Sequence, residues 1–207
     1  MPPRFFYFDL GNVLLFFDHQ QGCRQMAEAA GIDDPARVWQ AVFESGLELD
    51  YEAGKLSSRE FHEIFCERLG VQAAYEPLVL AAGAIFEVNM SIKPILAHLA
   101  AAGHRLGLLS NTNEIHWNYF SDGRYGLIPD AFETLVLSFE VGAMKPEPKI
   151  YEIAAERAGV APHEIFYIDD IPGHIAAAVA QGWDAVQYTT ASALASALRA
   201  RGVEFNY

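Results

Sequence analysis

The chain opens with a continuous apolar run. Residues 5–8 are Phe-Phe-Tyr-Phe, and Asp9 follows them two positions before Gly11. A short apolar run without polar alternation predicts a strand that is buried on both faces of an α/β sheet. Ligands bind beyond the carboxyl ends of the strands in such sheets, so Asp9 is a candidate nucleophile. For Asp9 alone, an Asx turn that merely ends the strand stays open as an alternative.

From about Asp18 to Asn89 the apolar positions recur at helical spacing, and no strand is predicted. The predicted helices cover residues 19–30, 34–44, 57–69 and 75–88. Ser57 and Glu60 have the spacing of a capping box at the start of the third helix. This stretch therefore predicts an all-helical insertion of roughly 70 residues.

From Ile92 onward, short apolar runs alternate with helix-length segments. The predicted strands cover residues 104–109, 134–137, 165–168 and 185–188. The predicted helices cover residues 93–102, a segment from about 113, and residues 148–158, 173–181 and 191–201. This alternation predicts a parallel sheet with right-handed crossovers. We expect an α/β, Rossmann-like core of residues 1–17 and 90–207, with residues 18–89 as a separate helical domain.

Composition and charge exclude several classes of function. The 207 residues are 52% hydrophobic and 20% charged, which is typical of a globular protein. The net charge of −13 and the lack of a Lys/Arg cluster argue against nucleic acid or a membrane as a partner. Cys23 and Cys66 have neither CxxC nor Cys/His spacing, so we expect a reduced, cytoplasmic protein without a zinc site. The apolar stretch at residues 79–85 is too short to span a bilayer.

Polar residues follow two later strands. Ser110 and Asn111 lie at the end of strand 104–109, just before a helix whose amides could bind an oxyanion, although capping of that helix is the alternative. Asp169 and Asp170 follow strand 165–168. Adjacent carboxylates repel each other unless a cation neutralises them, and Mg²⁺ suits oxygen ligands. Lys145 lies in a loop that Pro146 keeps extended.

The order of these residues along the chain, Asp, then Ser-Asn, then Lys-Pro, then Asp-Asp, resembles the haloacid-dehalogenase-like hydrolase superfamily. The resemblance covers nearly the whole chain, and residues 18–89 look like that family's C1-type helical cap. The opening Phe-Asp-Leu-Gly-Asn-Val and the segments 51–57 and 109–113 look most like the subgroup of bacterial α-D-glucose-1-phosphate phosphatase. The N-terminal phosphatase domain of soluble epoxide hydrolases is also similar.

The resemblance implies a Mg²⁺-dependent phosphatase for a small phosphorylated metabolite, with a sugar phosphate as the expected substrate. Asp9 would attack phosphorus and form an aspartyl-phosphate. Asp9, the backbone carbonyl of Gly11 and Asp170 would hold Mg²⁺, while Asp169 would orient these ligands from behind.

The same resemblance implies that Ser110, the backbone amide of Asn111 and Lys145 bind the phosphoryl group, with Ser110 and Lys145 also acting in catalysis. We expect a monomer or a homodimer. Two other functions stay open: a metal-independent 2-haloacid dehalogenase, which the adjacent Asp169 and Asp170 disfavour, and a catalytically weak phospho-ligand-binding protein.

Gly11 departs from the pattern, because phosphatases of this superfamily usually have an aspartate there that transfers a proton to the leaving oxygen. Such proton transfer is worth on the order of 10²–10⁴-fold in rate. Asp18, His19 and His174 are candidate substitutes, although a place in the cap hinge or on the surface is the alternative for each. The side chains that are candidates to set specificity come from the cap and its entry: Phe16, Phe17, His19, Phe43, Leu47 and Tyr51. For most of them a place in the core, at helical spacing, is an equally good account.

Overall fold

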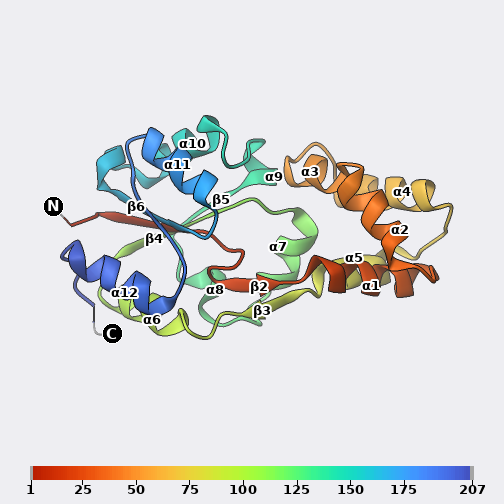
Figure 1. Ribbon diagram of the computed structural model, residues 1–207, viewed down its shortest axis with the longest axis horizontal. Helices are drawn as coiled ribbons and strands as arrows, with labels where there is room; N and C mark the ends of the chain where they lie inside the picture. The colour runs from red at the N-terminus through yellow and green to blue at the C-terminus, as the bar shows by residue number, and fades with distance from the viewer. Residues whose placement is uncertain (1, 206–207) are drawn as a thin grey trace.

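A parallel sheet forms the centre of the core (Figure 1). The computed structural model describes residues 2–205, and within them the sheet has five strands in the order β5-β4-β1-β6-β7. These strands are β1 (Phe5–Phe8), β4 (Arg105–Ser110), β5 (Thr134–Leu137), β6 (Ile165–Asp169) and β7 (Asp184–Gln187). Each neighbouring pair is parallel. The order places β1 centrally, as the sequence predicts, so Asp9 has neighbours on both sides.

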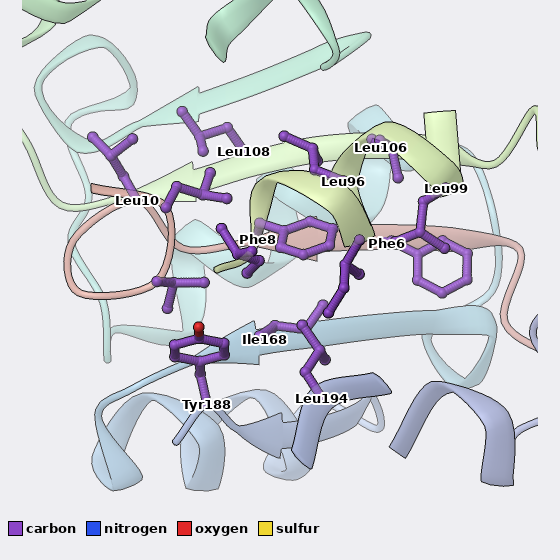
Figure 2. Packing of buried hydrophobic residues seen from close by; sticks show 14 of the residues in the cluster. Phe6, Phe8, Leu10, Leu96, Leu99, Leu106, Leu108, Ile168, Tyr188 and Leu194 are labelled. Atoms are coloured by element: carbon purple, nitrogen blue, oxygen red, sulfur yellow. The ribbon is translucent and has the colours of Figure 1, made fainter. Parts of the chain in front are cut away.

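Helices cover both faces of this sheet because successive side chains of a strand point to opposite faces. Phe6 and Phe8 face α6 (Lys93–Ala101) and α12 (Ala191–Ala200), as Figure 2 shows. Phe5 and Tyr7 face α10 (Pro148–Ala158) and α11 (Pro172–Ala180). All four side chains of β1 are fully buried. The result is the predicted Rossmann-like core.

A helical unit lies at the end of the sheet to which the strands' carboxyl ends point (Figure 1). It contains α1 (His19–Ala30), α2 (Pro35–Trp39), a π-helical turn (Gln40–Glu44), α3 (Leu47–Glu52), α4 (Ser58–Leu69) and α5 (Tyr75–Gly83). The unit has its own hydrophobic cluster, which includes Val38, Phe65 and Leu78. The capping box of Ser57 and Glu60 is present as predicted. The domain boundaries at residues 17/18 and 89/90 stay predictions.

The prediction of one helix over residues 75–88 is wrong. Helix α5 ends at Gly83, and Phe86–Val88 form β3, which pairs antiparallel with β2 (Leu15–Phe17). These two strands are the connections between the sheet and the helical unit, and they lie side by side (Figure 1). The backbone groups of β2 and β3 therefore form hydrogen bonds with each other. The periodicity of apolar residues within either segment does not reveal this pairing.

The remaining elements are short. They are α7 (Glu114–Phe120), α8 (Leu127–Asp130), α9 (Ser138–Val141) and a 3₁₀ turn (Pro162–Glu164). The sequence did not predict α3, α8 or α9, because a helix of one or two turns gives too little periodicity to recognise. None of the helices within residues 2–205 is both long enough and apolar enough to cross a membrane.

Candidate active site

A buried lysine joins two carboxylates at the carboxyl end of the sheet. The Nζ of Lys145 donates to Asp9 Oδ1 at 2.7 Å, to Asp169 Oδ2 at 2.8 Å and to the carbonyl of Leu109 at 3.0 Å. These three partners belong to the ends of β1, β6 and β4, which are neighbours in the sheet. The side chain of Lys145 is 1% exposed. The strand order thus brings three of the sequence-predicted site residues into direct contact.

The three charges perturb each other strongly because water is nearly excluded. Burial raises the pKa of Asp9 to about 7, although the Lys145 ammonium opposes this rise. Burial disfavours the charged form of Lys145. The negative charges of Asp9 and Asp169 more than offset this effect of burial, so the pKa of Lys145 lies above its usual value. Burial also opposes ionisation of Asp169, yet Lys145 and the hydrogen bond from His174 keep its pKa well below its usual range. One ammonium therefore faces two carboxylates, which leaves excess negative charge.

The oxygens of Asp169 are largely engaged by the protein itself. Oδ2 accepts hydrogen bonds from Lys145, from His174 Nδ1 at 3.0 Å and from the hydroxyl of Tyr167. Oδ1 accepts from the backbone amide of Ile171 at 2.7 Å. Sequence reasoning missed Tyr167, although its position two residues before Asp169 places both side chains on one face of β6. Asp169 is thereby fixed in place, which suits an orienting role better than a ligand role.

Asp170 retains more coordinating capacity. Carboxylate oxygens of Asp9, Asp169 and Asp170 lie within 4.8 Å of one another. The side-chain hydrogen bond that Asp170 accepts within residues 2–205 comes from Asn12 Nδ2 at 3.2 Å. Gly11 lies between Asp9 and Asn12 in a tight turn that begins at the end of β1. A set of hard oxygen donors around excess negative charge fits Mg²⁺.

The side chain of Asn111 positions Lys145. Asn111 Oδ1 accepts from the backbone amide of Lys145 at 2.8 Å, and Nδ2 donates to the carbonyl of Lys145 at 2.9 Å. Ser110 precedes it as the last residue of β4, is 1% exposed, and donates to the carbonyl of Asn111 at 3.2 Å. The sequence suggests a role only for the backbone amide of Asn111, because a contact with residue 145 has no local signature.

We expect Asn111→Ala to lower both stability and activity. The change leaves the backbone amide and carbonyl of Lys145 without partners, which costs about 1–3 kcal/mol of unfolding free energy. Urea unfolding measures this loss, and steady-state turnover measures the effect of a displaced Lys145. Asn118, an exposed asparagine on α7, provides the control, because Asn118→Ala should change stability by no more than about 0.5 kcal/mol. Equal stability of the two variants would contradict the positioning role.

A cavity lies between these residues and the helical unit, with a free volume of about 50 Å³. Gly11 and Ser110 line it from the core, and His19 and Glu52 line it from the helical unit. The ring of Phe17 occupies the space beside Gly11: a Cβ atom at position 11 would lie 2.7 Å from Phe17 Cε1. The aspartate that is usual at this position is therefore replaced by an aromatic ring from β2.

The candidate proton donors occupy three different environments. Asp18 is exposed, caps α1 by accepting from the amide of Gln20 at 2.8 Å, and pairs with Arg24 at 3.3 Å. His19 lies in the cavity. His174 is buried against Asp169, so its placement in the hinge or on the surface is wrong. The periodicity of α11 gave no sign that this helix would turn His174 toward the end of β6.

The other candidates for lining the cleft are not equivalent. Leu47 and Tyr51 are buried in the hydrophobic cluster of the helical unit. Phe43 packs against the ring of His19, with ring centroids 4.8 Å apart. Phe16 is 46% exposed and lies outside the cavity, beside Asp170 and Tyr188. Core packing therefore accounts for Leu47 and Tyr51, which helical spacing alone does not distinguish from cleft residues.

Comparison with known proteins places this site in a family. A model of haloacid dehalogenase-like hydrolases matches residues 4–182. The chain belongs to this family. The family that the motif order predicts is thus confirmed, and the protein is a hydrolase.

Individual relatives are similar over most of the chain. D-ribitol-5-phosphate phosphatase of Bacteroides thetaiotaomicron is 27% identical over 170 residues, which are 79% of this chain and 81% of the relative. Glyceraldehyde 3-phosphate phosphatase of Methanopyrus kandleri is 30% identical over 154 residues, 63% of this chain and 64% of the relative. A crystal structure of a family member from Bacteroides thetaiotaomicron, in complex with magnesium and inorganic phosphate, is also similar. Its TM-score is 0.78 at 25% sequence identity, and the match covers 91% of this chain and 95% of the crystallised chain.

Proposed function

We propose that the protein is a Mg²⁺-dependent phosphatase that hydrolyses the phosphate ester of a small sugar or polyol through an aspartyl-phosphate on Asp9. The observation that carries this proposal is the contact of Lys145 with both Asp9 and Asp169, next to Asp170. The names of the two phosphatase relatives and the magnesium and phosphate in the similar crystal structure support it.

Each residue has a distinct task in this mechanism. Lys145 holds Oδ1 of Asp9 and so orients the carboxylate that attacks phosphorus. Lys145, the Ser110 hydroxyl and the Asn111 amide offset the negative charge that grows on the phosphoryl oxygens. Asp9, the Gly11 carbonyl and Asp170 would hold Mg²⁺, which supplies Lewis-acid charge at the phosphoryl group when bound.

The lining of the cavity favours a substrate with a single phosphate. Glu52 lines it from the helical unit, together with His19. A second anionic group on the substrate would be repelled by the Glu52 carboxyl group and by the net charge of −13. A short polyol or sugar brings hydroxyl groups instead, which His19 and Glu52 can hydrogen-bond.

Phosphate release tests the proposal. We expect turnover of D-ribitol 5-phosphate, glyceraldehyde 3-phosphate or 4-nitrophenyl phosphate with Mg²⁺, and its loss after chelation with EDTA.

Asp170→Asn should raise the Mg²⁺ concentration needed for half-maximal activity by about 10–100-fold or more, because a charged ligand is lost. Asp33→Asn, at an exposed aspartate, is the control and should leave that concentration unchanged. Halide release from a 2-haloacid without any phosphate release would overturn the proposal in favour of a dehalogenase, and phosphate binding without turnover would favour the ligand-binding protein.

A further inference from the structure

The cavity is lined by a carboxylic acid that takes no part in the phosphoryl transfer described so far. Glu52 is the last residue of α3 and shares the cavity with Gly11, Ser110 and His19. Asp9 and Lys145 lie near enough to Glu52 to change its ionisation. We infer that Glu52 is the catalytic acid and base of this enzyme, acting on the leaving oxygen from the wall of the cavity that the helical unit forms. This inference rests on the proposed phosphatase function.

The usual position for this group carries no side chain, because residue 11 is glycine. The ring of Phe17 fills the space beside it and also packs on His19, with centroids 4.7 Å apart. The backbone of Gly11 is not left-handed, so a side chain there would require the ring to move but would not strain the backbone. In this chain a proton for the leaving oxygen must therefore come from another wall of the cavity.

Glu52 is fixed relative to the reacting centre. The Ser138 hydroxyl lies 2.6 Å from the carbonyl of Glu52 and accepts from the amide of Thr112 at 2.9 Å. Ser138 thus ties the end of α3 to the loop that follows Ser110. Gly54, with a left-handed φ of 71°, packs directly on the backbone of Phe139, where any Cβ would overlap the carbonyl oxygen. These two contacts anchor the backbone around Glu52 to the core, as a catalytic group requires.

The Glu52 carboxyl group is free to exchange a proton. Among residues 2–205, no side chain or backbone amide donates a hydrogen bond to this carboxyl group. Burial raises its pKa to about 7, with Lys145 opposing and Asp9 adding to the rise. Burial also lowers the pKa of His19, and it lowers that of His116 to about 3, so these neighbours are poor proton donors. A group that is half protonated near neutral pH can both give and take a proton.

Glu48, one helical turn earlier, provides the contrast. Glu48 is buried, whereas Glu52 is half-buried, and burial raises the pKa of Glu48 to about 8. Its Oε1 accepts a hydrogen bond from Asn113 Nδ2 at 2.8 Å, so it is engaged in holding α3 against the start of α7. Glu48 is a structural carboxyl group, whereas Glu52 faces the cavity.

The proton transfers balance over the two steps. In the first, Asp9 forms a bond to phosphorus, the bond from phosphorus to the ester oxygen breaks, and that oxygen takes the Glu52 proton to leave as an alcohol. In the second, the Glu52 carboxylate takes a proton from water while the water oxygen attacks phosphorus. The bond from phosphorus to Asp9 then breaks, which releases inorganic phosphate and restores both carboxyl groups.

Leaving-group dependence tests this assignment. An alkyl phosphate such as ribitol 5-phosphate needs a proton in the transition state, whereas 4-nitrophenyl phosphate does not. We expect Glu52→Gln to reduce kcat/KM about 10²–10⁴-fold for the alkyl ester and less than about 10-fold for the aryl ester. The wild-type decline in alkyl-ester activity above about pH 7 should disappear in this variant. Glu67→Gln, at an exposed glutamate on α4, is the control and should change neither rate.

A rescue variant and two contrary outcomes complete the test. Adding Gly11→Asp with Phe17→Ala to Glu52→Gln should restore the alkyl-ester rate at least in part, because the ring that blocks position 11 is gone. In the first contrary outcome, the Glu52→Gln protein keeps its melting temperature and the wild-type ratio of kcat/KM for the alkyl ester to kcat/KM for the aryl ester. That result would overturn the inference but leave the phosphatase proposal intact. If Glu52→Gln does not fold, Glu52→Ala, which also lacks the carboxyl group, gives the same comparison. A wild-type protein that hydrolyses neither ester would overturn both.

Discussion

Replacing Asp9 by asparagine should abolish turnover of every phosphate ester, whatever its leaving group. The amide cannot form the acyl-phosphate, and one ligand charge for Mg²⁺ is lost with it. Loss of a covalent nucleophile costs on the order of 10⁴–10⁶-fold in kcat. Rapid quenching followed by mass spectrometry should detect a phosphorylated peptide containing Asp9 in the wild type and none in the variant.

The stability of this variant separates chemistry from folding. Asp9→Asn removes one of two carboxylates that share one ammonium, so the excess buried negative charge falls and the protein should remain folded. Asp33→Asn should keep full activity, since that side chain is exposed. A folded Asp9→Asn protein that still formed a phosphorylated intermediate would place the nucleophile elsewhere.

Replacing Lys145 by methionine should have the largest effect on stability. It leaves Asp9 and Asp169 buried together without their counter-charge, which costs about 3–5 kcal/mol of unfolding free energy in the absence of Mg²⁺. Activity should also fall about 10²–10³-fold or more, as for other losses of transition-state charge stabilisation. Urea unfolding and steady-state kinetics measure the two effects, and Lys149→Met, at an exposed lysine four residues away, should change neither.

The Lys145→Met variant should also acquire a distinct pH dependence. Without the ammonium, the pKa values of the two carboxyl groups in the folded state lie above those in the unfolded chain. The folded state then binds more protons, so stability should rise as the pH falls from 7 toward 5 and decline as the pH rises. A variant whose stability stayed constant over this range would contradict the assignment of Lys145 as counter-charge.

The sequence alone determined the fold class and showed which polar residues follow the ends of the strands. Apolar runs such as residues 5–8 and 165–168 predict buried strands because each run is a local property of the chain. Parallel strands of one sheet have their carboxyl ends at the same edge, so the residues that follow them converge. The motif order added the family, which the match over residues 4–182 confirms.

Tertiary structure decided which side chains act on one another. Lys145 lies 136 positions from Asp9 along the chain, and their contact depends on the order of the strands, which no local pattern specifies. The pairing of β2 with β3 and the approach of Glu52 to Gly11 likewise depend on how the helical unit docks on the core. Local propensity acts over a few residues, whereas these contacts form only when segments distant in sequence bury their surfaces together.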